Sequence, residues 1–333
     1  MKYTNIPFVD KPVSRIVLGG SGKLFTSGGD VAGVMETALE CGINCVDTAR
    51  EYGNSEAAIG RYFREHGRRD DFVLISKCCH PTLAFLQRVT PSAAESDLLR
   101  SLDILETDHI DIYFLHRDDE SVSVGKIAEC MHRFHEEGKI KAFGGSNWSA
   151  KRISELNAYA KSHGLTGFTV SSPHYSLGRQ LHDPWGNGCK TITGDKNAPQ
   201  REYYKSTGMP LFCWAALCGG MFSGAVKSTE PGPMMKHLGF NSTWGYGCRD
   251  NFERLHRCEI LAKEKNVSVA QIALAWLLGS ELNTLAIVGC NTPKRVLENA
   301  RAAELVLTQA ERRWLENVSV NRAAGRTQDE PAV

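Results

Sequence analysis

Eight short apolar segments, each followed by a stretch with helical periodicity, place the strongest constraint on how this 333-residue chain can fold. The segments are rich in Val, Ile and Phe, and they are RIVLG (15–19), INCVD (43–47), FVLIS (72–76), IDIYFLH (110–116), IKAFGGS (140–146), FTVSS (168–172), PLFCW (210–214) and TLAIVG (284–289). Nearly continuous apolar strands that alternate with amphipathic helices indicate a parallel sheet covered on both faces. Eight such units predict an α/β fold of the closed (β/α)8 type, the TIM barrel, and an open doubly wound sheet is the alternative.

The remaining segments fit around one barrel. The residues before the first strand, KYTNIP and DKPVS, predict a β-hairpin that fills the barrel floor. Two connections, 178–200 after the sixth strand and roughly 219–251 after the seventh, are long enough to be functional loops. We therefore expect a single barrel domain over residues 1–320 and a polar C-terminal tail over 321–333.

Composition limits the classes of partner. The chain has 39 basic and 38 acidic residues and a net charge of +1, which removes the electrostatic argument for nucleic acid or an anionic membrane. The N-terminus lacks the apolar region of a signal peptide, and no stretch of 18 apolar residues occurs. The eleven cysteines contain no CxxC pair and are expected to be reduced thiols. We expect a cytoplasmic protein that binds small molecules.

Polar residues follow several of the predicted strands, at the ends that meet at one mouth of the barrel. Strand two ends at Asp47, with Tyr52 five residues later, strand three ends at Ser76 and Lys77, and strand four ends at His116. A lysine ammonium beside a phenol would lower the tyrosine pKa from about 10 by roughly one to three units. Taken singly, each residue is more often a cap, a packing aromatic or part of a surface ion pair. Their convergence favours general acid catalysis by Tyr52.

The motifs that contain these residues resemble those of the aldo-keto reductase family. They are DTAREYG, LISK, YFLH, GGSNW, SSPHYSL, GGMFSG, QIALAWLL and IVGCNTPKRVLENA, in family order over nearly the whole chain. The resemblance implies that Asp47, Tyr52, Lys77 and His116 form a catalytic tetrad. It also implies direct hydride transfer from NADPH, or alternatively NADH, to an aldehyde or ketone. Two alternatives stay open: an alcohol or sugar dehydrogenase, and a slowly turning over redox-sensor module that holds the cofactor.

The cofactor site must be built without a Rossmann motif, because no GxGxxG follows a predicted strand. The resemblance implies that the phosphates lie on residues 217–224 and 289–299, where a helix beginning near Pro293 offers free N–H groups. The expected cofactor-binding residues are Gly20, Ser146, Asn147, Ser172, Trp214, Ala215, Leu217, Gly220, Gly289, Cys290, Asn291, Arg295, Glu298 and Asn299.

Among these residues, Ser146 and Asn147 are expected to hold the nicotinamide carboxamide, and Trp214 to stack on the nicotinamide ring. Four positions depart from the family pattern. Gly289 and Cys290 replace a lysine and a serine that many members use for the adenosine 2′-phosphate, whereas Ser172 replaces a glutamine and Ala215 a serine.

Two arginines lie beside members of the tetrad. Arg50 and Arg117 either meet an anionic substrate or pair with Glu51, Asp118 or Asp119.

The residues around the mouth also include candidate ligands and aromatic walls. Cys79 and His80 have metal-ligand side chains, but no second pair lies at ligand spacing, so no metal site is predicted. His80 is expected at the pocket rim instead. Trp185, Trp244 and Tyr246, in the two long connections, either anchor these loops or face the substrate.

Overall fold

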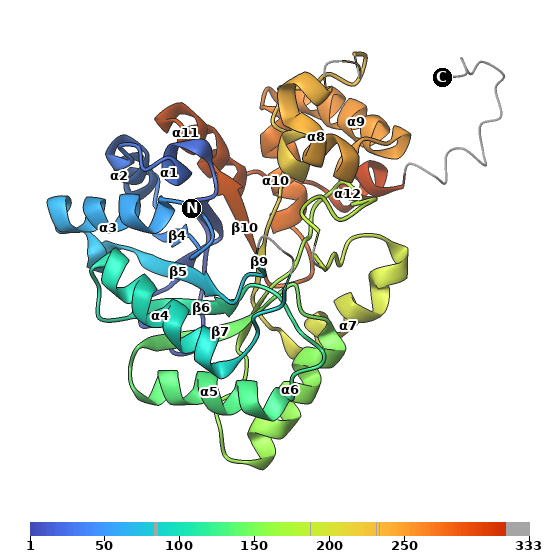
Figure 1. Ribbon diagram of the computed structural model, residues 1–333. Coiled ribbons are helices and arrows are strands. Elements are labelled where there is room, and N and C mark those ends of the chain that lie inside the picture. Colours follow the sequence, from blue (N-terminus) through green and yellow to red (C-terminus); the bar gives the residue numbers. More distant parts are fainter. Residues whose placement is uncertain (83–85, 187, 231, 233, 318–333) are drawn as a thin grey trace.

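The chain folds into a closed barrel of eight parallel strands in the computed structural model (Figure 1), which describes residues 1–82, 86–186, 188–230, 232 and 234–317. The barrel confirms the (β/α)8 prediction, and the alternative of an open sheet is wrong. The boundary expected at residue 320 and the tail over 321–333 lie outside the described residues.

Each barrel strand overlaps one of the eight apolar segments. The strands are β3 (Ile16–Gly19), β4 (Cys45–Asp47), β5 (Val73–Cys78), β6 (Ile110–Leu115), β7 (Ile140–Ser146), β8 (Val170–Ser172), β9 (Leu211–Cys213) and β10 (Thr284–Gly289). They are hydrogen-bonded in chain order, and β10 closes the ring by pairing with β3, with Ala286 beside Ile16. All eight carboxyl ends therefore lie at one rim.

The expected hairpin is present at the other end of the barrel. Its strands β1 (Tyr3–Thr4) and β2 (Val13–Ser14) pair antiparallel. Ile6 and Val13 are buried in the same apolar cluster as strand residues inside the barrel, including Val17 and Phe114. Side chains of the hairpin segment thus fill the floor.

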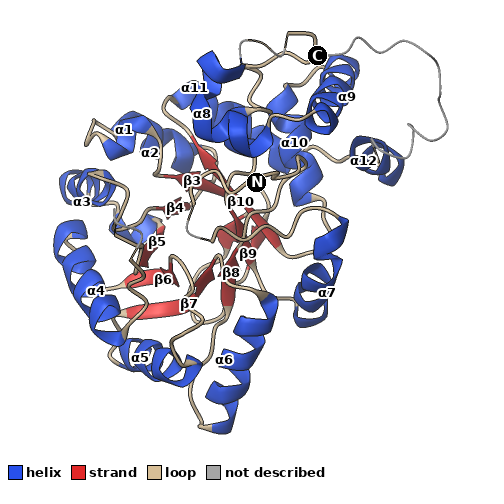
Figure 2. Ribbon diagram, turned by 45° about the vertical axis from the view of Figure 1, so that its right-hand side comes forward, coloured by secondary structure: helices blue, strands red, loops and turns tan. Residues whose placement is uncertain are grey.

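Helices surround the strands as a ring, which Figure 2 shows from a second direction. They are α1 (Lys23–Thr26), α2 (Ala32–Glu40), α3 (Ser55–His66), α4 (Pro91–Leu105), α5 (Val124–Glu136), α6 (Ala150–Ser162), α7 (Ala198–Thr207), α8 (Met234–Tyr246), α9 (Arg249–Lys265), α10 (Val269–Leu278), α11 (Pro293–Ala300) and α12 (Gln309–Glu316). Short 3₁₀ turns η1 (Arg69–Asp71), η2 (Asp195–Asn197), η3 (Cys218–Gly220) and η4 (Arg301–Ala303) complete the described elements. The outward side chains of the strands and the inward faces of the helices form a second, larger apolar cluster.

The two long connections differ in structure. After β8, the described residues of 173–194 form no helix or strand beyond isolated bridges of His174 to Thr191 and Trp214. The connection after β9 contains α8, a helix that the sequence pattern did not predict. Helix α8 is interrupted at Gly239 (φ 75°, ψ 178°). The two helical pieces on either side are too short to show a continuous helical repeat of apolar residues in the sequence.

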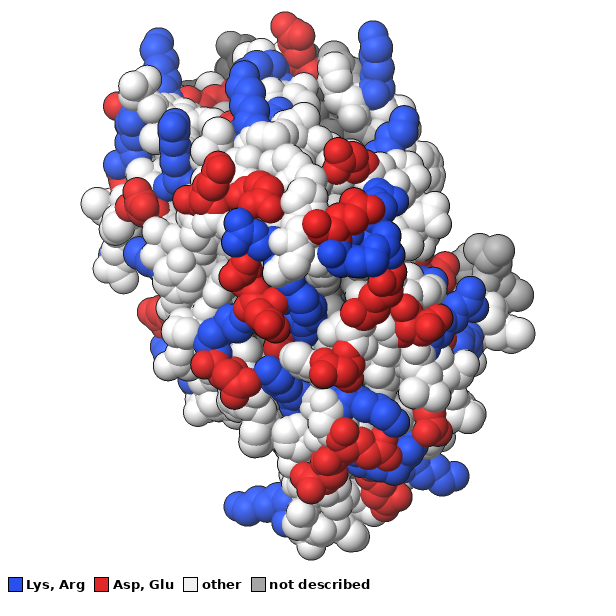
Figure 3. All heavy atoms as spheres, turned by 90° about the vertical axis from the view of Figure 1, so that its left-hand side faces the viewer, with Lys and Arg blue, Asp and Glu red and all other residues white. Residues whose placement is uncertain are grey.

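The charged surface, the helices and the cysteines are consistent with what the composition suggested. Lys and Arg are interspersed with Asp and Glu on the face drawn in Figure 3. None of the described helices is both long and apolar enough to cross a membrane. All eleven cysteines are unpaired, and eight of them are buried.

Candidate active site

A buried ion pair lies at the carboxyl ends of two neighbouring strands. Asp47 ends β4 and Lys77 is the penultimate residue of β5. The Lys77 ammonium donates to Asp47 Oδ1 at 2.5 Å and to the carbonyl oxygen of Thr48 at 2.9 Å, and both charged side chains are 3% exposed. Burial alone would lower the pKa of Lys77, but Asp47 and Tyr52 reverse this and raise it. The lysine is therefore held in its charged form.

Tyr52 lies in the short loop between β4 and α3. Its backbone N–H donates to the Ala49 carbonyl at 3.0 Å, and Gly53 follows with a positive φ of 55° before α3 begins. This turn places the phenol oxygen 3.4 Å from Lys77 Nζ. The ring of Tyr52 meets the His116 ring edge-on, with 5.6 Å between centroids. The structure thus brings together all four residues of the expected tetrad.

The direction of the pKa shift of Tyr52 differs from the expectation. Burial raises the pKa of the phenol above its usual value, and the Lys77 ammonium offsets only part of this rise. The net direction predicted from the lysine alone is therefore wrong, because desolvation of a phenolate outweighs one nearby charge. At neutral pH the phenol keeps its proton, which is the form that a general acid requires.

His116 follows β6 and is buried, and burial, followed by the charges of Arg117, Lys77 and His80, lowers its pKa well below the usual value. The imidazole is therefore neutral. Its Nδ1 has no hydrogen-bond partner among the described residues, and the His80 ring meets it edge-on at 4.8 Å. His80 lies on the cavity wall, as expected for a rim residue.

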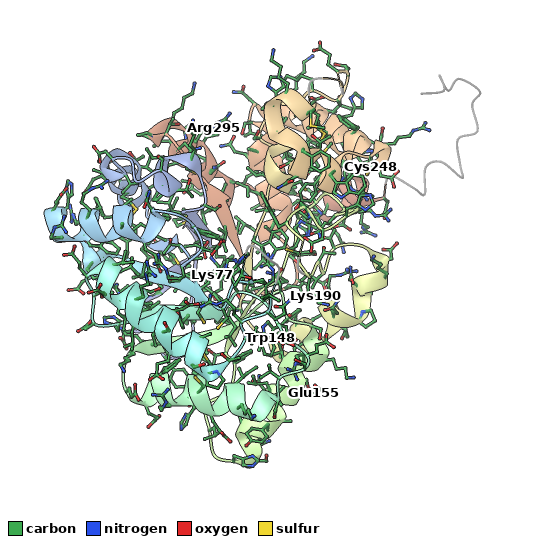
Figure 4. The ribbon with its side chains drawn as sticks, in the orientation of Figure 1. Lys77, Trp148, Glu155, Lys190, Cys248 and Arg295 are labelled. Carbon is green, nitrogen blue, oxygen red and sulfur yellow. The ribbon has the colours of Figure 1, made fainter. Side chains whose placement is uncertain are left out.

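These residues line one cavity of about 710 Å³ at the carboxyl rim. In Figure 4, Lys77 and Lys190 lie near the middle of the molecule and Arg295 lies farther out on α11. Of the expected cofactor residues, eight line the cavity: Ser146, Asn147, Ser172, Trp214, Ala215, Leu217, Gly220 and Gly289. The other six lie outside the lining, and they are Gly20, Cys290, Asn291, Arg295, Glu298 and Asn299.

The side chains expected to hold a carboxamide already bond to each other and to the backbone. Ser146 Oγ donates to the Ser172 carbonyl at 3.1 Å, and Ser172 Oγ donates to the Phe212 carbonyl at 2.8 Å. Asn147 Nδ2 donates to Ser146 Oγ and to the His116 carbonyl, both at 3.2 Å. The set is pre-organised, and a ligand amide would have to exchange with one of these bonds.

Trp214, just after β9, is tied to the same asparagine. Its Nε1 donates to Asn147 Oδ1 at 3.1 Å, and the Lys190 backbone N–H donates to the same oxygen at 3.1 Å. His174 packs against the Trp214 ring with 4.9 Å between centroids. The indole therefore forms a flat wall of the cavity in a fixed orientation, as stacking on a planar ring requires.

Some expected residues outside the lining join the loops after β9 and β10 to α11. The Arg295 guanidinium on α11 donates to the Ser223 carbonyl at 3.1 Å and pairs with Glu298 at 2.8 Å, which links α11 to the loop after β9. Asn299 Nδ2 donates to Cys290 Sγ at 3.2 Å.

Two further expected residues pack close to these loops. Asn291 Oδ1 accepts from the Leu24 backbone N–H at 3.1 Å. A Cβ at Gly20 would lie 2.7 Å from both the Asp47 carbonyl oxygen and Ser55 Oγ, so this position excludes larger residues. Asn291 thus joins the loop after β10 to α1, and Gly20 lets the loop after β3 approach the end of β4.

A nicotinamide dinucleotide fits this arrangement. The cavity continues from the tetrad past Trp214 and Leu217 to Gly220 and Gly289, between the ends of β9 and β10. The exposed Arg295 supplies a cation beyond it. Such a cofactor needs an apolar wall for its ring, hydrogen-bond partners for its amide and a cation for its phosphates, and the residues described provide all three.

Sequence reasoning left several neighbours open or missed them. Arg50 pairs with the buried Glu56, which also accepts from Ser76 Oγ at 2.7 Å, so neither Arg50 nor Ser76 faces the cavity. Arg117 lines the cavity. Thr48 contributes only its backbone carbonyl oxygen, which accepts from Lys77, and side-chain chemistry could not have predicted this contact. Glu56 could have been suggested from the sequence, because an acidic residue follows Ser55 at the start of α3.

The three loop aromatics separate into two groups. Trp185 is exposed but lines the cavity, so it is a wall residue. Trp244 stacks on His182 with 4.0 Å between centroids, and the buried Tyr246 packs against His174 with 5.6 Å between centroids. These two anchor the loops.

Asp47, Lys77, Tyr52 and His116 surround one cavity at the carboxyl rim of the barrel, an arrangement suited to proton transfer. The model of the Aldo/keto reductase family matches residues 15–319, and the chain therefore belongs to this family of oxidoreductases.

Curated relatives are distant but cover most of the chain. The chain is 26% identical to aldo-keto reductase YhdN of Bacillus subtilis, over 88% of this chain and 86% of the relative. It is 25% identical to norsolorinic acid reductase A of Aspergillus parasiticus, over 85% and 70% of the two chains. It is also 25% identical to a putative voltage-gated potassium channel subunit beta of Schizosaccharomyces pombe, over 88% and 86%.

Proposed function

We propose that this protein reduces an aldehyde or ketone to an alcohol, with NADPH as the preferred cofactor and Tyr52 as the general acid. The observation that carries the proposal is the position of Lys77, whose ammonium bonds Asp47 at 2.5 Å and the Tyr52 phenol at 3.4 Å inside the cavity. This arrangement supplies a proton donor and a fixed positive charge at one point.

Each side chain has one role in the proposed reaction. Bound NADPH would supply a hydride to the carbonyl carbon. The Tyr52 phenol donates its proton to the carbonyl oxygen, and the phenolate that forms is stabilised by Lys77. Asp47 keeps Lys77 charged, and the neutral His116 orients the carbonyl oxygen toward the phenol.

The chain's own residues would hold the cofactor along the cavity. Ser146, Asn147 and Ser172 would bind the carboxamide, and Trp214 would pack on the ring. The phosphates would lie by Leu217, Gly220 and Gly289, where the start of α11 would turn the positive end of its dipole toward them. Pro293 has no N–H and the Arg295 N–H already donates to Thr292 Oγ1 at 3.4 Å, so few free N–H groups remain there. Arg295 favours NADP over NAD, because a guanidinium pairs well with a phosphate.

Reduction is favoured over two alternative functions. An alcohol or sugar dehydrogenase would use the same residues in the reverse direction, but the raised pKa of Tyr52 favours the protonated form, which acts in reduction. A slowly turning over redox module remains the second candidate, because the chain resembles a protein described as a putative potassium channel subunit.

One assay tests the proposal directly. Purified protein would be mixed with NADPH or NADH and a panel of aldehydes, ketones and sugars, and absorbance at the nicotinamide band would be followed. Rapid multiple turnover with an aldehyde is expected. Tight NADPH binding without turnover of any carbonyl compound would favour the redox module instead.

A further inference from the structure

Arg117 is a buried cation in the cavity that the proposed chemistry does not use. It follows His116 directly and is 4% exposed. Its carbonyl oxygen accepts from Trp148 Nε1 at 3.0 Å, which fixes its backbone. Its Nη1 donates to the His116 carbonyl at 2.9 Å, and its Nε has no hydrogen-bond partner among the described residues.

No carboxylate in the described part of the chain forms an ion pair with Arg117. The neighbouring Asp118 pairs with Arg152 at 3.3 Å. The Asp183 carboxylate accepts hydrogen bonds from three backbone N–H groups of its own loop. Glu51 also lines the cavity, but it is exposed and not within ion-pair distance of the guanidinium.

A buried guanidinium without a counter-ion is unfavourable, and its planar fork of N–H donors matches a carboxylate or a phosphate. The two histidine rings beside Arg117, those of His80 and His116, carry no charge. Burial and then the charge of Arg117 lower the pKa of both His80 and His116, so both are neutral. Backbone hydrogen bonds lower the pKa of Asp183 against the effect of burial, and the Arg117 charge lowers it further, but neither Asp183 nor any other carboxylate in the described residues forms an ion pair with the guanidinium.

The location of Arg117 separates it from the cofactor phosphates. It follows β6, which lies opposite β10 in the ring of eight strands, whereas the proposed phosphate loops follow β9 and β10. Trp185 and Cys189, from the connection after β8, line the same cavity. An anion bound by Arg117 would thus belong to the substrate.

We propose that the substrate is a carbonyl compound carrying an anionic group, a carboxylate or a phosphate ester, which Arg117 binds while Tyr52 meets the carbonyl oxygen. This inference rests on the proposed carbonyl reduction and specifies its substrate class. Arg117 is then a specificity-determining residue that offers up to two donors to the anion.

Matched substrate pairs test the proposal. Wild-type protein is expected to reduce 2-, 3- or 4-carboxybenzaldehyde, or glyceraldehyde 3-phosphate, with a kcat/KM at least about tenfold above that for the corresponding methyl formylbenzoate or glyceraldehyde. The better of the two charged groups identifies the anion. Equal kcat/KM values within both pairs would overturn the proposal.

Variants separate recognition from structure. Arg117→Met removes the charge and keeps an unbranched side chain, and it is expected to lower the charged-to-neutral ratio of kcat/KM by roughly 10- to 100-fold. Arg117→Lys should retain part of the ratio. Arg179→Met, which removes a half-exposed arginine outside the cavity lining, is the control and should keep the wild-type ratio. An unchanged ratio in Arg117→Met would contradict the proposal.

A binding measurement distinguishes this inference from the proposed reaction. Calorimetric titration with benzoate or phenyl phosphate, against benzamide, is expected to show anion binding that Arg117→Met abolishes. If no carbonyl compound is reduced but this binding persists, the reaction is wrong and the anion site stands. If reduction occurs but neither anion binds more tightly than benzamide, the reaction stands and the anion site is wrong. Should Arg117→Met fail to fold, the wild-type titration and Arg117→Lys still decide the matter.

Discussion

Tyr52→Phe should separate catalysis from stability. The phenol oxygen has one hydrogen bond within the described residues, at 3.4 Å to Lys77 Nζ. A bond of that length lies at the weak end of the range of about 0.5–1.5 kcal/mol for net hydrogen-bond contributions. The ring, which carries the packing against His116, remains. We expect the melting temperature to change by less than about 2 °C.

The loss in activity should be far larger. Removing a general acid reduces the rate by roughly 10²–10⁴, which corresponds to about 2.7–5.4 kcal/mol of lost transition-state stabilisation. Single-turnover reduction of a reactive aldehyde by enzyme preloaded with NADPH, followed in a stopped-flow instrument, measures the chemical step. NADPH affinity, measured by fluorescence titration, should be unchanged.

Tyr204→Phe is the matched control. Its phenol is fully buried and shares a 3.0 Å hydrogen bond with Ser171 Oγ, outside the cavity. Its loss should destabilise the protein by about 1 kcal/mol with no change in the chemical step. If Tyr52→Phe kept more than about a tenth of the wild-type single-turnover rate, Tyr52 would be a packing aromatic and not the acid.

Three further predictions concern pH, cofactor preference and the nicotinamide wall. Because burial raises the pKa of Tyr52, the phenol keeps its proton as the pH rises, and kcat/KM for reduction should stay level to about pH 10 and fall only above it. A decline centred near pH 7 would contradict this, and Lys77→Met should move the decline of its residual rate to still higher pH. Arg295→Ala should weaken NADPH binding at least tenfold more than NADH binding, whereas Glu298→Gln should strengthen NADPH, since the carboxylate that pairs with Arg295 at 2.8 Å competes with a phosphate. Equal changes for both cofactors in fluorescence titrations would refute it. NADPH binding should quench tryptophan emission, and Trp214→Phe should remove most of this quench. If the quench is the same in Trp214→Phe and the wild type, Trp214 does not stack on the nicotinamide.

The barrel could be predicted because each strand is buried on two faces and so appears as an apolar run. For β7 and β10 the predicted and observed limits agree, whereas β4 and β8 are shorter than the runs that predicted them. Helix α8 escaped prediction because its interruption at Gly239 removes the apolar period by which a helix is recognised.

The residues of the site could be predicted from the sequence, but the hydrogen bonds between them and the pKa shifts could not. Alternation along β5 places Val73 and Ile75 inside the barrel, so Lys77 faces in and Ser76 faces out toward α3. The strand-end pattern offered both residues, and only the family resemblance selected Lys77. The direction of the Tyr52 pKa shift depended on the degree of burial, which requires the packed structure.

The hairpin that fills the barrel floor makes the barrel a cup with its opening at the catalytic rim. Two molecules that react in such a cup have to pass the same opening, so the one bound deeper must enter first and leave last. In the proposed reaction this shared opening would impose a compulsory order of binding, with release of the deeper molecule as a step that can limit turnover even when chemistry is fast.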